Sequence, residues 1–149
     1  MYKNGRDVLR ASGAAQSLHD EVIAIAAAQI EDDGYIVETN PGPEKNRSIA
    51  KGQWPDIVAS STNEARTTLF LEWVFEVETA DSVTREQAVN QWAGYAETAS
   101  ALAARFALIV PFESVVQARA LLDEYGIEGP LFYFEQTKGK VTVSLDDQR

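Results

Sequence analysis

Cysteine is absent from this 149-residue chain, and histidine occurs only once, at His19. Without thiols, neither a disulfide framework nor a thiolate metal site is available, and a reduced compartment is permitted. A lone histidine does not make a zinc site, so His19 is interpreted as a surface or interface residue. No stretch approaches the roughly 18 apolar residues of a membrane span, and no apolar segment follows the polar N-terminus. The sequence therefore predicts a soluble, cytoplasmic protein with no membrane partner.

Basic residues are scarce, because 13 lysines and arginines face 23 aspartates and glutamates, giving a net charge of -10. DNA affinity draws mainly on lysine and arginine contacts to phosphates, so this composition argues against nucleic-acid binding. The distribution is uneven, however, and a locally positive segment carries Lys45, Arg47, Lys51 and Arg66 against Asp56 and Glu64. This segment is either a surface for a polyanion or a solvated loop with incidental bases.

The patterning predicts one folded domain over residues 1–149. Apolar residues make up 45% of the chain, enough for a real core, and no repeat or linker interrupts it. A helix is predicted over residues 14–30 from an apolar stripe at three- and four-residue spacing: Leu18, Val22, Ile25, Ala26 and Ile30. Glu21 is expected to border the buried face of this helix. A solvated flanking glutamate is the alternative.

The most informative segment is residues 69–77, where apolar and mostly acidic positions alternate. A period of two predicts a strand whose apolar face lies on the core, with Trp73 and Phe75 nearly buried. Glu76 shares the other face with Glu78, and their side chains start roughly 6.6 Å apart, so each can reach a common cation. The alternative is a solvated strand face with ordinary acids.

A second short strand is predicted to begin at Pro55 and Asp56, ahead of the apolar residues 57–59. Proline at the first residue of a strand costs no ladder hydrogen bond. An aspartate at the start of one strand and acids at the end of the next can converge and offer a divalent cation oxygen ligands from different elements. We therefore expect the Asp56 carboxylate to approach Glu76 across two paired strands.

Further elements follow along the chain. Thr84 to Gln87 has the form of a capping box and predicts the start of a helix. Residues 106–110 read as a strand covered on both faces, and residues 113–125 as a helix that ends before Gly126. Two terminal strands are predicted at 131–134 and 141–145.

Pro55-Asp56 followed by Glu76-Val77-Glu78 resembles the motif of the PD-(D/E)XK, or restriction-endonuclease-like, nuclease superfamily. The resemblance covers about residues 14–111. It implies an α/β fold with a three-layer core, in which helices flank a mixed central sheet in the order helix, three strands, helix, strand, here followed by a helix and two strands. It also implies a nuclease that hydrolyses DNA with Mg²⁺ or Mn²⁺, held by Asp56, Glu76 and Glu78.

Other positions in the chain are also similar to functional residues of this superfamily. Gln91 and Tyr95 are similar to a Gln-x-x-x-Tyr motif in the branch related to the RecB family; the glutamine can hydrogen-bond metal-bound water or phosphate, and the tyrosine can brace it. Core packing of an aromatic stripe is the alternative. Glu21 occupies the place of a first-helix glutamate that joins the metal site in the family. If DNA is the substrate, we expect the loop at 40–53 to touch it. The predicted nucleic-acid contacts are Lys45, Arg47, Lys51 and Tyr95.

Glu78 stands where the superfamily usually has a lysine that offsets charge on the phosphate. A carboxylate cannot do that, although it can hold a second metal ion or act as a general base. Lys51 or Arg85 can supply the missing charge from another element. Two functions stay open: a Mg²⁺-dependent nuclease, and an inactive domain of the same fold that serves as a partner-binding or architectural subunit, in a homodimer or with another protein. An acidic DNA mimic is a third.

Overall fold

The computed structural model describes residues 5–148, with side chains from residue 15 onward. Within this range three α-helices, one short 3-10 helix and six strands alternate along the chain. Their bounds are α1 (Gly5–Asp32), β1 (Ile36–Thr39), β2 (Ile57–Thr62), β3 (Leu69–Val77), α2 (Glu86–Ala101), β4 (Arg105–Pro111), η1 (Phe112–Ser114), α3 (Val115–Glu124), β5 (Leu131–Thr137) and β6 (Lys140–Ser144).

The six strands form one mixed sheet in which neighbours in sequence are also neighbours in space, in the order β1-β2-β3-β4-β5-β6. Strands β1, β2 and β3 pair antiparallel, and so do β5 and β6. The two central pairings, β3 with β4 and β4 with β5, are parallel. A parallel connection needs a crossover, and α2 and then η1 with α3 provide the two crossovers.

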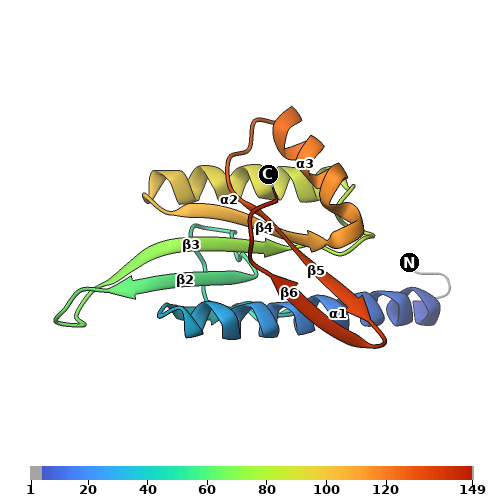
Figure 1. The fold of residues 1–149 in the computed structure, drawn as a ribbon, viewed down its shortest axis with the longest axis horizontal. Helices are drawn as coiled ribbons and strands as arrows, with labels where there is room; N and C mark the ends of the chain where they lie inside the picture. Colours follow the sequence, from blue (N-terminus) through green and yellow to red (C-terminus); the bar gives the residue numbers. More distant parts are fainter. Residues whose placement is uncertain (1–4, 149) are drawn as a thin grey trace.

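Helices cover both faces of the sheet (Figure 1). Helix α1 packs on one face, in a cluster that includes Val22, Ile23, Ala26, Ile57, Phe75 and Ile109. Helices α2 and α3 pack on the other, in a cluster that includes Trp92, Tyr95, Leu122, Val74, Leu108 and Leu131. The predicted α/β class, with a mixed central sheet between helices, is confirmed. Among residues 5–148, no helix combines the length and apolarity needed to cross a membrane.

Helix α1 is longer than the 14–30 predicted from the apolar stripe, since it begins at Gly5 and ends at Asp32. No proline interrupts residues 5–13, so nothing stops the helix from extending toward the N-terminus. The stripe itself packs on the sheet, with Val22 and Ala26 fully buried. Gly34 follows with a φ of +100°, a left-handed conformation that glycine adopts readily, and turns the chain into β1.

Strand β3 does not keep the uninterrupted alternation predicted for it. Ala59 pairs with Trp73 and the next residue of β2, Ser60, pairs with Leu71, so Glu72 is the extra residue of a bulge. A bulge moves the side chains beyond it to the opposite face. Leu71 therefore packs under α2, whereas Trp73 packs on the α1 side.

The outer end of the β2–β3 hairpin extends past the helices (Figure 1). Leu69 and Phe70 are consequently exposed, at 48% and 50%, so the prediction that the apolar face of residues 69–77 lies on the core is wrong at Leu69. Phe75, at the inner end, is buried as predicted. Trp73 is only half-buried, and the Arg105 guanidinium lies 4.3 Å from its ring centroid.

The later predicted elements are confirmed with one exception. The apolar run at 106–110 is the fully covered strand β4, and the terminal strands form the β5–β6 hairpin. The expected capping box is wrong, because α2 begins at Glu86 with Arg85 as its N-cap and without a side-chain cap. Thr84 instead lies in the turn before the helix.

Strand β4 lies in the buried core, so we predict that two leucine-to-alanine substitutions, one in this strand and one outside it, will differ in their effect on stability. Leu108 in β4 is fully buried, whereas Leu102 after α2 is 50% exposed. Leu108→Ala is expected to lower the free energy of unfolding by about 2–5 kcal/mol, because it leaves a cavity. Leu102→Ala is expected to cost about 1 kcal/mol or less. Urea denaturation measures both, and equal losses would contradict this picture of the core.

Candidate functional site

Three acidic side chains meet where the start of β2 lies beside the end of β3. Asp56 directly precedes β2, Glu76 is the second-last residue of β3, and Glu78 follows that strand. Because β2 and β3 are antiparallel and Ile57 pairs with Phe75, the next step of the ladder brings Asp56 beside Glu76. All three acids are buried, with exposed fractions of 7%, 7% and 6%. The alternative of a solvated acidic strand face is therefore wrong for Glu76 and Glu78.

Backbone amides tie the first two acids together. The Asp56 backbone N–H donates to Glu76 Oε1 at 3.1 Å, and the Val77 backbone N–H donates to Asp56 Oδ2 at 2.7 Å. Each strand thus binds the carboxylate of the other, and the two acids come together as the strand pairing predicted. Such fixed geometry is what a preorganised site needs.

The environment of Glu76 disfavours its charged form. Burial raises the pKa of Glu76 well above its ordinary value, and the negative charges of Asp56 and Glu78 raise it further. Glu76 therefore either keeps a proton or needs a compensating cation nearby.

Glu78 is held more completely than its neighbours. Ser82 Oγ donates to Glu78 Oε1 at 2.6 Å, and the indole Nε1 of Trp92 donates to Oε2 at 2.9 Å. Burial raises the pKa of Glu78, while these two hydrogen bonds oppose the rise. Because Trp92 is fully buried in α2, Glu78 connects the end of β3 to that helix.

Helix α1 brings His19 to the acids, a contact that the sequence interpretation missed. His19 Nε2 lies 3.1 Å from Asp56 Oδ2, and Nδ1 lies 3.3 Å from Asp20 Oδ1. His19 is partly exposed and lines the pocket described below, so its interpretation as a surface residue holds in part but omitted its contact with Asp56. The signal was present in the helical spacing, because His19 lies three residues before Val22 and four before Ile23, both buried.

Glu21 does not lie where the sequence suggested. Its side chain is exposed and is not among the residues that line the pocket described below. The helix turns by about 100° per residue, so the residue just before buried Val22 can still face solvent. Among the α1 side chains that the structure describes, from residue 15 onward, His19 contacts Asp56.

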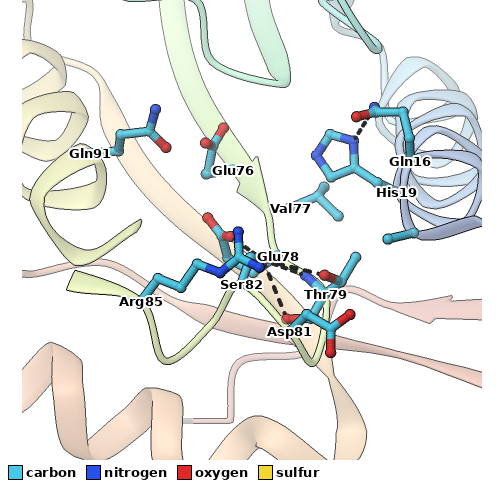
Figure 2. A pocket seen from close by; sticks show the side chains of 11 residues that line it. Gln16, His19, Glu76, Val77, Glu78, Thr79, Asp81, Ser82, Arg85 and Gln91 are labelled. Atoms are coloured by element: carbon cyan, nitrogen blue, oxygen red, sulfur yellow. Dashed lines mark hydrogen bonds between the residues drawn. The ribbon is translucent and has the colours of Figure 1, made fainter. Parts of the chain in front are cut away.

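Glu76 and Glu78 line a pocket of about 380 Å³ between α1 and α2, and Asp56 lies behind this lining, in contact with His19 and Glu76. Figure 2 shows Gln16 and His19 on one side, Gln91 and Arg85 on the other, and Glu76 between them. Gln91 is exposed and lines this pocket, so its amide is available to a bound molecule. The pocket therefore combines acids, amides and one arginine.

Tyr95 lies inside the protein, with only 6% of its surface exposed. Burial raises the pKa of Tyr95, and the nearby charges of Glu76 and Asp56 raise it further. Tyr95 thus packs in the core between α2 and the sheet, as the core-packing alternative predicts, and this leaves little surface for stacking on a nucleic acid.

The predicted basic contacts lie outside the pocket. Lys45 is exposed with its Nζ 5.8 Å from the centroid of a Trp54 ring, Arg47 Nη1 is 3.3 Å from Glu38 Oε1, and Lys51 is exposed. None of the three is among the residues that line the acidic pocket.

Asn40 holds the loop at residues 40–53 in place through hydrogen bonds, and its role was not predicted from the sequence. Its Nδ2 donates to the Pro55 carbonyl at 2.6 Å and to the Arg47 carbonyl at 2.7 Å, while its Oδ1 accepts from the Asn46 and Arg47 amides. Asn40 is 4% exposed. The signal was an asparagine directly before a Pro-Gly turn, a common position for side-chain capping of backbone groups. Asn40 fixes the segment that leads to Asp56.

Within the described side chains, no group of three or more histidine, aspartate and glutamate residues is arranged to hold a metal ion. Asp56 and Glu76 remain as a pair of adjacent oxygen donors. A pair is chemically sufficient for Mg²⁺, which commonly binds one or two carboxylates and completes its shell with water and phosphate oxygens.

No protein-family model matches this chain, and no curated protein or solved structure matches it either.

The His19–Asp56 contact predicts a pH dependence. Burial alone would lower the pKa of His19, but hydrogen bonds and charge from Asp56, then Asp20, outweigh it and raise the pKa from 6.5 to about 9. Protonated His19 therefore stabilises the fold fully below pH 6.5, and this stabilisation is lost as pH rises through 9.

We expect the ring signals of this single histidine to titrate near pH 9 by NMR in metal-free buffer. Asp56→Asn should lower that midpoint more than Asp20→Asn does, because Asp56 contributes the larger interactions. A wild-type midpoint at or below 6.5 would contradict the contact.

Proposed function

We propose that this chain is a restriction-endonuclease-like domain that hydrolyses phosphodiester bonds in DNA with Mg²⁺ or Mn²⁺. The order of elements supports it: helix, three strands, helix, strand. So does the pairing of Asp56 at the start of β2 with Glu76 at the end of β3. Gln91 lines the same pocket from the following helix, as the resemblance implies.

One observation carries the proposal, namely the burial of Asp56 beside Glu76, which lines a pocket. Two carboxylates in a shared, poorly solvated space repel each other, and a divalent cation relieves this repulsion. The donor set fits such an ion, since carboxylate oxygens suit Mg²⁺ and Mn²⁺.

Asp56 and Glu76 would hold the ion, which supplies polarisation of the phosphodiester and a lowered pKa for a bound water. The Val77 backbone N–H keeps Asp56 in place, and the Asp56 backbone N–H does the same for Glu76. The Gln91 amide can donate to a phosphate oxygen or accept from water at the pocket. Burial of Asp56 and Glu76 keeps bulk water from competing for their carboxylates.

The direct test is cleavage of labelled single-stranded, branched and plasmid DNA in Mg²⁺ or Mn²⁺ at low salt. Low salt is needed because so acidic a chain holds DNA through few basic contacts. Asp56→Asn and Glu76→Gln keep the shape of each side chain and should each reduce the rate about a hundredfold or more, through loss of a ligand worth several kcal/mol.

Glu72→Gln is the matched control, because Glu72 lies on the same strand and its carboxylate accepts from Ser61 Oγ, away from the pocket. Its rate should stay within about twofold of wild type, as for a surface change remote from the chemistry. Equal losses in all three variants would point to general destabilisation and not to a site. No cleavage by wild type under any of these conditions would refute the catalytic proposal.

Metal binding gives an independent prediction. If Asp56 and Glu76 hold an ion, Mn²⁺ at about 100 times its Kd should raise the free energy of unfolding by about 2.7 kcal/mol and raise Tm with it. Asp56→Asn should remove most of this shift, while Glu72→Gln should retain it. Differential scanning calorimetry with and without Mn²⁺ measures the effect, and an unchanged Tm in wild type would count against a metal site.

The inactive, partner-binding alternative has its own support. Glu78 replaces the usual lysine and uses both carboxylate oxygens inside the protein. A second hollow of about 570 Å³ at the hairpin end is lined partly by exposed apolar residues, Leu69, Phe70 and Leu102. Exposed apolar surface of this kind is typical of protein contacts. Absence of DNA cleavage by the wild type, together with a dimer measured by analytical ultracentrifugation, would favour this function.

A further inference from the structure

We propose that Arg85 binds the phosphate of the substrate and supplies the positive charge that a lysine at position 78 would bring, while Glu78 is a positioning residue for the turn that carries Arg85. This inference rests on the proposed function and deepens it, because it assigns a role to two residues of the same pocket.

Glu78 is already committed to internal contacts. Its two carboxylate oxygens accept hydrogen bonds at 2.6 Å from Ser82 Oγ and at 2.9 Å from Trp92 Nε1. A metal ion or a proton on either oxygen would withdraw charge from it and weaken the hydrogen bond that it accepts from Ser82 or from the fully buried Trp92. The geometry therefore favours Glu78 as an anchor over Glu78 as a ligand or general base.

The anchor holds a tight turn between β3 and α2. Ser82 Oγ, which binds Glu78, also accepts from the Thr79 backbone N–H at 3.0 Å. The Ser82 carbonyl in turn accepts from the Arg85 backbone N–H at 3.0 Å. A continuous chain of hydrogen bonds therefore runs from Glu78 through Ser82 to the backbone of Arg85, the N-cap residue of α2.

Arg85 presents its side chain to the pocket. It lines the same pocket as Glu76, Glu78 and Gln91, and Figure 2 shows its guanidinium on the side opposite His19. The side chain is exposed and takes part in no ion pair with the residues that the structure describes. A guanidinium is always charged and can bind a phosphate through two parallel hydrogen bonds.

The other candidate cations are less suitable. Lys51 is exposed but does not line the pocket. His19 lines it, yet one ring nitrogen faces Asp56 and the other faces Asp20, so both are already in contact with acids. Asp81 adds a further acid to the pocket lining. Arg85 is the one lysine or arginine among the described residues that line this pocket, so its positive charge can offset these acids when a phosphate approaches.

Binding can be measured separately from cleavage, with a fluorescein-labelled single-stranded oligonucleotide in Ca²⁺ at low salt, by anisotropy. Arg85→Gln is expected to raise the Kd about tenfold or more, the effect of losing a hydrogen bond to a charged group, and Arg85→Lys should lie between it and wild type. Loss of one phosphate contact should also reduce the slope of log K against log salt by about 0.7.

Arg66→Gln is the matched control, since Arg66 is also exposed but lies at the outer tip of the β2–β3 hairpin. Its Kd should remain within about twofold of wild type. Equal weakening by Arg66→Gln and Arg85→Gln would mean that only net charge matters, and it would overturn the inference.

The role of Glu78 is tested by metal affinity. Glutamine can accept from Trp92 Nε1 and donate to Ser82 Oγ, so Glu78→Gln should keep its Mn²⁺ Kd within about threefold of wild type, whereas a lost ligand costs far more. Glu76→Gln provides that comparison in the same titration. A Glu78→Gln variant that loses Mn²⁺ as severely as Glu76→Gln would show that Glu78 is a ligand, and would overturn its assignment as an anchor.

A double-mutant cycle tests whether Ser82, the hydrogen-bond partner of Glu78, acts through Arg85. Ser82→Ala should weaken oligonucleotide binding and leave the Mn²⁺ Kd unchanged. Once Arg85→Gln is present, Ser82→Ala should have little further effect, because the residue that the turn positions is gone. Additive effects in this cycle would contradict the positioning role.

The outcomes separate this inference from the proposed function. Cleavage by wild type with an unchanged Kd and KM in Arg85→Gln would leave the nuclease standing and overturn the role of Arg85. Oligonucleotide binding that depends on Arg85 without any cleavage would support the phosphate site and refute the catalytic proposal. Absence of both binding and cleavage in wild type would overturn both.

Discussion

The pairing of the start of β2 with the end of β3 is the contact on which the rest of this protein depends. It buries Asp56 beside Glu76, and such a pair is unfavourable unless donors or cations surround it. The strands supply part of this through their own amides, at 2.7 Å to Asp56 and 3.1 Å to Glu76. A chain that only needed a core would have placed apolar residues here, so the cost of burying these acids is an argument for function.

The two helices beside the site complete what the strands begin. Helix α1 brings His19 within 3.1 Å of Asp56, and α2 brings the indole of Trp92 within 2.9 Å of Glu78. Each helix also buries its apolar face on the sheet, so the packing that stabilises the fold fixes the polar contacts too. This arrangement keeps the acids within a rigid frame while leaving one side open to a pocket.

The net charge of -10 and the absence of a lysine at position 78 set limits on any substrate. A polyanion has little general attraction to such a surface, so recognition would depend on a few specific contacts. In the proposed arrangement Arg85, together with an ion that Asp56 and Glu76 would hold, would supply the positive charge locally. Glu78 then stabilises the turn that makes Arg85 available, so the carboxylate serves the site without binding the ion.

The sequence by itself determined the α/β class, most of the strands and helices, and the approach of Asp56 to Glu76. Hydrophobic periodicity and the order of elements along the chain can both be read from the sequence. Tertiary structure decided the rest. The bulge at Glu72 placed Leu71 on the face of the sheet opposite to Trp73, because the register of a strand depends on its partner strand. Glu21 proved exposed and His19 reached Asp56, because the rotation of α1 about its axis is set by packing on the sheet. Both oxygens of Glu78 were taken by Ser82 and Trp92, four and fourteen residues further on, and a contact with a different helix cannot be read from the pattern of one strand.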